Sequence, residues 1–158
     1  YCLLTIHRAE NTTKDVLPKR IRQVSQLETK IVYPIHPRTK KCLKEYSIAI
    51  PDNLMLIEPV GWLDLMGLVK HAQYVLTDSG GLQKEALWHG KHCFTLRNET
   101  EWIETVEQKS NSIVREEDSL DVTTIHNGDF TNPFGNGNSS EEIVDIIKNN
   151  FRDDLFVS

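Results

Sequence analysis

A repeated alternation of short β-branched runs with amphipathic stretches is the feature of this sequence that most constrains its fold. Strand-like runs occupy residues 2–6, 30–35, 54–58, 74–77, 93–96 and, more weakly, 112–114. Stretches with helical spacing lie at residues 17–27, 39–46, 63–71, 82–88, 101–108 and 141–150. Strands and helices in this order predict right-handed crossovers and a parallel sheet covered on both faces. The predicted fold class is α/β, a single doubly wound, Rossmann-like domain.

One polar segment separates the last predicted helix from the rest of the chain. Residues 127–138 contain three Gly, one Pro and four Asn, a composition typical of a loop. The sequence SSEE at residues 139–142 follows it and has the pattern of a capping box, which predicts a helix start. We therefore expect this segment to be a linker and the final helix to be placed separately.

Composition indicates one soluble domain and excludes several classes of partner. The chain has 158 residues, of which 39% are hydrophobic and 26% charged, and its formal net charge is −5. This acidic balance argues against a general binder of nucleic acid or of acidic membranes, because such binders need a basic face. No apolar run approaches the roughly 20 residues that a membrane-spanning helix needs.

The cysteines and the start of the chain bear on its location. Cys2, Cys42 and Cys93 form no CxxC pair, so the sequence predicts neither a disulfide framework nor a zinc site, and a reducing cytosol fits best. Tyr1 opens directly into a strand-like run, without the basic and apolar segments of a secretory signal. We expect a cytoplasmic protein with further chain upstream of Tyr1.

Basic side chains follow the predicted strands at the points where a ligand is expected. In an open parallel sheet, ligands bind beyond the carboxyl ends of the strands. The basic residues at these ends are His7, Arg8, His36, Arg38 and Arg97. Two histidines and three arginines make a positively biased crevice on a protein of negative net charge. The sequence therefore predicts an anionic ligand at this edge.

The loop after the fourth predicted strand has the pattern of a phosphate site. Ser79, Gly80 and Gly81 directly precede a predicted helix. Bare backbone N–H groups and the helix dipole attract phosphate there, and glycine permits close approach because it has no Cβ. Glu85, one turn along, is placed to accept hydrogen bonds from sugar hydroxyls. A plain turn is the alternative, since neither a GxGxxG nor a P-loop motif is present.

Other notable residues have simpler interpretations. Surface or core positions are expected for His71, His89, His92 and His126, and packing positions for Trp62 and Trp88. A solvated helix start is one interpretation of Glu99, Glu101, Glu104 and Glu107, because acids favour that end of the helix dipole, and it is the favoured interpretation for Glu107 alone. Cys42 is expected to be an inert helix residue rather than a nucleophile, since nothing in its neighbourhood argues for a reactive thiol.

Five segments, taken in order, carry a resemblance to a known family. They are TIHRAENT at residues 5–12, PIHPRT at 34–39, PVGWLD at 59–64, LTDSGGLQKEA at 76–86 and LRNETEWIETVE at 96–107. Together they resemble the C-terminal domain of the non-hydrolysing UDP-N-acetylglucosamine 2-epimerases, which have a two-domain, GT-B-like fold. The resemblance implies that residues 1–158 are the UDP-binding domain of such an enzyme and that its N-terminal domain is absent from this chain.

The resemblance also implies roles for residues of the first and fourth segments. Ser79, Gly80 and Gly81 match the loop that holds the diphosphate, and Glu85 matches the glutamate that binds ribose hydroxyls. His7 matches the catalytic histidine near the diphosphate and the reacting sugar. As a cation or hydrogen-bond donor, such a histidine meets the negative charge that develops on departing UDP.

Five further residues are assigned to substrate binding in the same way. His36 and Arg38 are expected to line the same crevice. Arg8, Glu10 and Asn11 are expected to border a regulatory UDP-sugar site, because the first segment of bacterial relatives does so.

The activity implied by the resemblance is inversion at C2 of a UDP-sugar. UDP leaves by anti elimination to give a 2-acetamidoglucal and then re-adds on the other face, interconverting UDP-N-acetylglucosamine and UDP-N-acetylmannosamine for surface polysaccharide synthesis. The carboxylate base is expected in the absent N-terminal domain. The partners implied are the UDP-sugar, that domain and a second copy in a homodimer, with no metal, cofactor, nucleic acid or membrane.

Three departures from the family pattern leave alternatives open. Trp102 and Ile103 stand where many bacterial relatives have Arg-Pro, Lys84 replaces a more usual acid, and Leu65 replaces an aromatic that faces uracil. The alternatives are a hydrolysing epimerase, an epimerase of a modified UDP-2-acetamido sugar, a GT-B glycosyltransferase and a nucleotide-sugar-binding module.

Overall fold

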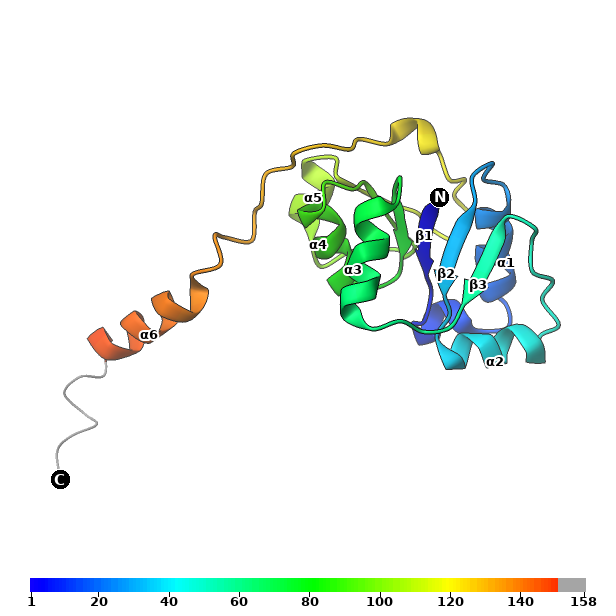
Figure 1. Ribbon diagram of the computed structural model, residues 1–158, viewed down its shortest axis with the longest axis horizontal. Helices are drawn as coiled ribbons and strands as arrows, with labels where there is room; N and C mark the ends of the chain where they lie inside the picture. Colours follow the sequence, from blue (N-terminus) through cyan, green and yellow to red (C-terminus); the bar gives the residue numbers. More distant parts are fainter. Residues whose placement is uncertain (151–158) are drawn as a thin grey trace, which may run out of the picture.

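Six parallel strands form one sheet in the order β3-β2-β1-β4-β5-β6 (Figure 1). The structure is a computed structural model that describes residues 1–150, so the predicted domain of residues 1–158 extends into residues outside the described part. The strands are β1 (Cys2–Thr5), β2 (Ile31–Pro34), β3 (Leu54–Ile57), β4 (Val75–Thr77), β5 (Cys93–Thr95) and β6 (Asn111–Ile113). The order reverses between β1 and β4, as in a doubly wound sheet, which confirms the predicted fold class.

Helices connect the strands and cover both faces of the sheet. They are α1 (Leu17–Ser25), α2 (Pro37–Glu45), α3 (Trp62–His71), α4 (Gly80–Trp88) and α5 (Ile103–Glu107), followed by α6 (Ser139–Asn150). Figure 1 shows α1 and α2 on one side of the strands and α3 and α4 on the other. Two short 3-10 helices, η1 (Ala9–Thr12) and η2 (Val122–Thr124), were not predicted. No helix among residues 1–150 has the length and apolar character needed to cross a membrane.

Alternate residues of β1 explain why the sheet is buried on both faces. Leu4 belongs to a core cluster that includes Val24 of α1, whereas Leu3 belongs to a second cluster with Val69 of α3 and Ala86 of α4. Successive side chains of a strand point to opposite faces, so a continuous apolar run serves both clusters. Because the strands are buried on both faces, the polar side chains available to a ligand come from the loops at the carboxyl ends of the strands.

Five helix starts, those of α2 to α6, differ from the predicted residues by one or two positions, and side-chain caps account for two of them. The side chain of Ser79 accepts a hydrogen bond from Leu82 N, so α4 begins at Gly80 instead of residue 82. His36 caps α2 in the same way, which moves that start to Pro37. The predicted capping box is wrong in register, since α6 begins at Ser139 itself.

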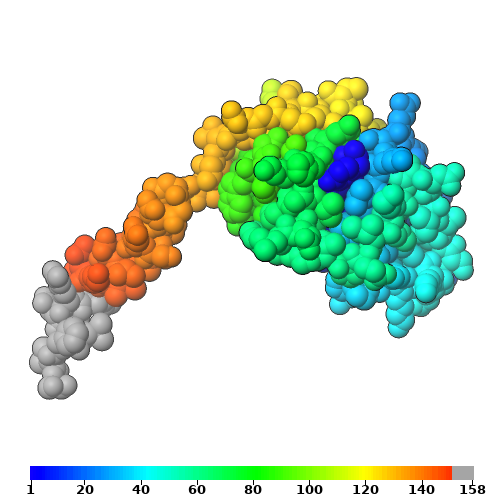
Figure 2. All heavy atoms as spheres, in the orientation of Figure 1, coloured from blue at the N-terminus to red at the C-terminus, as the bar shows by residue number. Residues whose placement is uncertain are grey.

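The segment between η2 and α6 is a loop, as predicted, but part of it packs on the domain. Asn132 accepts a hydrogen bond from the Trp88 indole at 3.2 Å, and Phe134 makes an edge contact with Trp102. Beyond it α6 stands clear of the sheet (Figures 1 and 2) and has no buried residue. Its exposed apolar residues are Ile143, Val144, Ile146 and Ile147.

Candidate functional site

A cleft of about 330 Å³ lies at the carboxyl edge of the sheet. Its walls come from the loops after β1, β2 and β3 and from the first turns of α3 and α4. The lining residues are Thr5, Ile6, His7, Pro34, His36, Pro59, Val60, Leu65, Ser79, Gly81, Leu82 and Glu85. The structure thus brings together His7, His36, Ser79, Gly81 and Glu85, which the sequence had assigned to one site.

The start of α4 forms one wall of this cleft. Ser79 Oγ accepts a hydrogen bond from Leu82 N at 3.4 Å, which satisfies one of the donors of the first turn. The helix itself offers no acceptor to the N–H groups of Gly80 and Gly81. Gly81 is exposed and lines the cleft, and the nearest atom to a Cβ built there is Ser79 Oγ at 3.9 Å. Open space and free donors at a helix N-terminus suit a phosphate group.

Gly80 has different surroundings, and the expectation of two bare glycines is corrected at this position. Gly80 is buried and is not among the residues that line the cleft. Trp102 Nε1 donates a hydrogen bond to Gly80 O at 2.8 Å. A Cβ at Gly80 would overlap the Glu101 carboxylate, so glycine is required here by the packing of the segment after β5.

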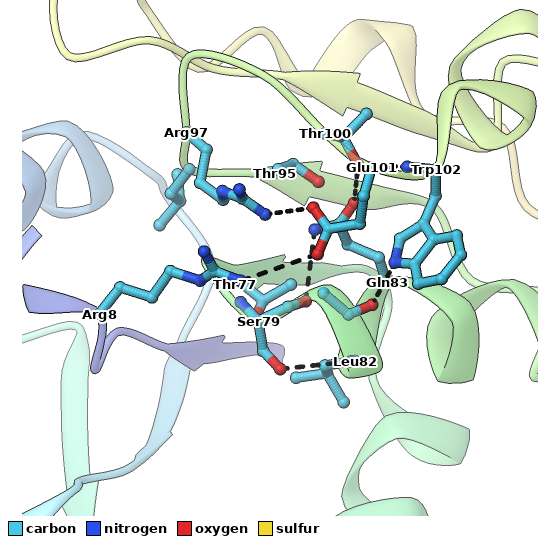
Figure 3. A network of polar contacts seen from close by, with 12 residues as sticks. Arg8, Thr77, Ser79, Leu82, Gln83, Thr95, Arg97, Thr100, Glu101 and Trp102 are labelled. Carbon is cyan, nitrogen blue, oxygen red and sulfur yellow. Dashed lines mark hydrogen bonds and ion pairs between the residues drawn. The ribbon is translucent and has the colours of Figure 1, made fainter. Parts of the chain in front are cut away.

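Glu101 lies between two arginines next to this helix start (Figure 3). Its carboxylate accepts a hydrogen bond from Arg97 Nη1 at 2.5 Å and lies 3.7 Å from Arg8 Nη2. Burial raises the pKa of Glu101, but its own backbone N–H and the two arginines outweigh this effect, so the net pKa lies below its ordinary value. Glu101 is therefore an exposed ion-pair partner that lies before α5 and is not part of its first turn.

The residues predicted for a regulatory site separate into two environments. Glu10 and Asn11 line a second cavity of about 480 Å³ together with Arg97, whose Nε lies 3.8 Å from Glu10. Arg8 faces Glu101. Sequence reasoning noted Arg97 only as a basic residue at a strand end and missed its partners, although Arg97 and Glu101 stand four residues apart.

The side chain of Asn11 is buried and engaged within the fold. Its Nδ2 donates to Leu96 O at 2.8 Å and to Asp78 Oδ2 at 3.2 Å, and its Oδ1 accepts from Arg20 Nε at 3.2 Å. Arg20 is itself 2% exposed and also donates to backbone carbonyls of residues 114 and 115. Asn11 therefore stabilises the loop that carries His7.

Two histidines face each other across the mouth of the cleft, with ring centroids 6.1 Å apart. His7 is 42% exposed at its side chain and extends from the loop after β1. His36 Nδ1 accepts a hydrogen bond from Arg38 N at 3.2 Å, which fixes the imidazole at the start of α2. Arg38 is exposed and is not among the cleft-lining residues.

Glu85 has a partner that the sequence did not predict. Its Oε1 accepts a hydrogen bond from Trp62 Nε1 at 2.8 Å. Trp62 was expected to be a packing residue, yet it is 63% exposed and belongs to the first turn of α3. The indole holds one carboxylate oxygen of Glu85 and leaves the other oxygen available beside the cleft.

The ionisable groups of the described chain favour anion and sugar recognition over metal binding. Among residues 1–150, no group of three or more His, Cys, Asp or Glu is arranged to hold a metal ion. The cleft instead combines two imidazoles, backbone N–H groups, a hydroxyl and one carboxylate. This set matches a phosphate next to a polyol, because N–H donors suit the first and a carboxylate acceptor suits the second.

Comparisons with known proteins identify sequences and structures to which this chain is similar. The sequence profile of the family described as UDP-N-acetylglucosamine 2-epimerase matches residues 1–148. A UDP-N-acetylglucosamine 2-epimerase homolog of Methanococcus maripaludis is 43% identical, with 94% of this chain and 44% of that protein covered. The UDP-2,3-diacetamido-2,3-dideoxy-D-glucuronate 2-epimerase of Pseudomonas aeruginosa is 32% identical, with 93% and 44% covered.

A solved structure shows the same fold. The UDP-GlcNAc 2-epimerase of Methanocaldococcus jannaschii, in complex with UDP-GlcNAc and UDP, superposes with a TM-score of 0.75 at 38% identity. The alignment covers 94% of this chain and 45% of that one. The chain thus spans slightly less than half the length of the relatives that it matches.

Proposed function

The chain belongs to the UDP-N-acetylglucosamine 2-epimerase family, and from this membership we propose that it is the UDP-binding part of an enzyme that interconverts UDP-N-acetylglucosamine and UDP-N-acetylmannosamine. One observation carries the proposal: the start of α4, Glu85 and His7 line a single cleft at the carboxyl edge of the sheet. That cleft offers donors for a diphosphate beside an acceptor for ribose hydroxyls.

The proposed binding mode follows from the position of each group. The diphosphate lies at the N–H of Gly81 and the hydroxyl of Ser79, where the α4 dipole favours negative charge. Glu85 accepts hydrogen bonds from the ribose with the oxygen that Trp62 leaves free. His7 lines the same cleft, and we assign it to the bond between the sugar and UDP.

The proposed reaction uses these groups to stabilise departing UDP. A base removes the C2 proton, the C1–O bond breaks with its electron pair going to UDP, and a 2-acetamidoglucal forms. UDP then re-adds to C1 while a proton returns to the opposite face of C2, which inverts that centre. His7 and the α4 donors stabilise the negative charge on UDP and hold it in place for re-addition.

The rest of the enzyme is part of the proposal, because this chain spans about 44% of its relatives' length. The base that acts at C2 is assigned to an N-terminal domain that this chain lacks. The exposed apolar residues of α6 support a further packing partner, since a soluble helix of this kind normally buries one face. Homodimerisation and a cytoplasmic location complete the proposal.

A second candidate substrate is a modified UDP-2-acetamido sugar. Trp102 stands where many relatives have arginine, and its indole bonds to Gly80 O instead of reaching the cleft. A cationic contact to the ligand is thereby lost at this position. The relative from Pseudomonas aeruginosa that is named for a diacetamido sugar substrate is 32% identical to this chain.

Titration of UDP into the 158-residue chain tests the proposal directly. We expect weak binding by calorimetry, no epimerisation by this chain alone, and a loss of binding in Glu85→Ala. Glu28→Ala is the matched control, because Glu28 is exposed and precedes β2 at the opposite edge of the sheet. Wild-type chain that does not bind UDP, or equal binding by the two variants, would refute the assignment. Turnover by this chain alone would contradict the assignment of the base to another domain.

A further inference from the structure

A fully buried carboxylate, Asp78, lies directly after β4 and beneath the cleft. It is 0% exposed and accepts hydrogen bonds from the loop after β1. The donors are His7 N at 3.0 Å, Arg8 N at 2.9 Å and Asn11 Nδ2 at 3.2 Å. A buried carboxylate needs several such donors, because it has lost its hydration. Asp78 therefore ties the backbone of the His7 loop to the tip of β4.

The same carboxylate also meets the side chain of His7. His7 Nδ1 lies 3.3 Å from Asp78 Oδ1. Among the described residues 1–150, His7 is the one basic side chain within ion-pair distance of Asp78. The nearest buried cation, Arg20, reaches Asp78 only through Asn11.

These contacts define which nitrogen of His7 faces the ligand. The backbone bonds fix where the residue leaves β1, and the Nδ1 contact fixes the ring, so Nε2 is directed away from Asp78. His7 lines the cleft with Ser79 and Gly81, where the diphosphate is proposed to bind. The polar partner of one ring nitrogen of histidine determines the role of the other, and a carboxylate at 3.3 Å is such a partner for Nδ1.

We propose that Asp78 is the positioning residue for His7. When the imidazole is protonated on both nitrogens, Asp78 holds the Nδ1 proton, and the Nε2 proton is directed to the phosphate oxygen that departs from the sugar. The proposal rests on the proposed function, in which His7 faces UDP. Buried acids next to histidine act in this way in other enzymes, by setting tautomer and orientation without themselves taking the proton.

Nitrogen-15 spectra of the imidazole side chains in the 158-residue chain give the first test. We expect the neutral form of His7 to carry its single proton on Nδ1, and a neutral form with its single proton on Nε2 would overturn the proposal. Asp78→Asn presents an amide of similar shape, and we expect the Nδ1–H preference to be lost. Thr12→Val is the control, because Thr12 belongs to the same loop and bonds to Ala9 O instead of Asp78. An unchanged His7 tautomer in a folded Asp78→Asn chain would also overturn the proposal. If that variant does not fold, the His7 tautomer in the wild-type spectrum is the deciding measurement.

Kinetics of the full-length enzyme give the second test. We expect Asp78→Asn to lower kcat by about 100-fold, the size of a general acid–base contribution, with little change in KM. A rise in KM alone would assign Asp78 to loop stability and contradict the positioning role. The two proposals fail separately: a full-length wild type without epimerase activity refutes the proposed function, while the tautomer of His7 is measured independently of activity.

Discussion

Replacing each of the two glycines at the start of α4 by alanine is expected to have opposite effects. A methyl group at Gly81 meets nothing closer than Ser79 Oγ, at 3.9 Å, whereas one at Gly80 overlaps the Glu101 carboxylate. Gly81→Ala therefore adds a methyl group at the wall of the cleft. Gly80→Ala forces Glu101 to move and disturbs its hydrogen bond with Arg97.

The expected change in stability follows from these surroundings. Alanine is favoured over glycine within a helix by up to about 1 kcal/mol, so Gly81→Ala keeps or raises the free energy of unfolding. Gly80→Ala has the same gain but weakens a partly exposed ion pair, worth up to about 1 kcal/mol, and strains the bond from Trp102 to Gly80 O. With about 1 kcal/mol for that bond, Gly80→Ala is expected to be less stable than Gly81→Ala by about 1–2 kcal/mol.

Binding of UDP is expected to rank the two variants in the reverse order. Hydrogen bonds to a charged group are worth about 1.5–3 kcal/mol, so losing one at Gly81 weakens binding by about 10-fold to 100-fold. Gly80 does not line the cleft, so its variant keeps more of the affinity.

Urea denaturation and calorimetric titration of both variants measure the two rankings. Wild-type affinity in the Gly81→Ala chain would show that the phosphate binds elsewhere. Equal stability of the two variants would instead show that the packing of Glu101 against Gly80 does not require glycine at that position.

Three further predictions concern stability and reactivity. Burial, followed by the nearby His126, lowers the pKa of His92 to about 4, so the unfolded chain binds more protons between pH 4 and 6.5. The free energy of unfolding is expected to fall by about 2–3 kcal/mol as pH drops through that range, and less in His92→Gln, measured by urea denaturation. Arg20→Met is expected to lower the free energy of unfolding by about 3 kcal/mol, because several buried acceptors lose their donor. The exposed control Arg22→Met is expected to change it by less than about 0.5 kcal/mol. Burial raises the pKa of the Cys2 thiol to about 11 and that of the Cys93 thiol to about 12. A thiol reagent is therefore expected to modify Cys42, the free cysteine that is not fully buried, first in the native chain.

The strands were predictable from the sequence because burial on both faces leaves a continuous apolar run. All six strands occur where the periodicity placed them, and the site lies where a parallel sheet is expected to bind its ligand. Convergence of His7, Ser79 and Glu85 then followed from topology alone. Helix starts were less predictable, because Ser79 and His36 act as caps through side-chain directions that periodicity does not contain.

Contacts between loops could not be predicted from the sequence either, because they also depend on the directions of side chains. The sequence shows that Asp78 ends one strand and His7 follows another, but not that the carboxylate turns inward to bond that loop. Likewise, the sequence offered a solvated helix start as one interpretation of Glu101, because acids are common there. Its contact with Gly80 depends on where α5 begins and on how the chain leaves β5.

Two departures from the family pattern contact each other in the structure. Lys84 replaces a more usual acid and Trp102 replaces a more usual arginine, and in this chain Lys84 Nζ lies 4.1 Å from the centroid of the Trp102 ring. In this chain the lysine and the tryptophan form a cation–π contact, worth about 0.5–1 kcal/mol at an exposed site. This contact is an attraction between α4 and the segment before α5, and the indole N–H remains available to Gly80 O. Lys84 and Trp102 therefore contribute together to the packing that holds the start of α4 in place, one through the ring and the other through the indole N–H.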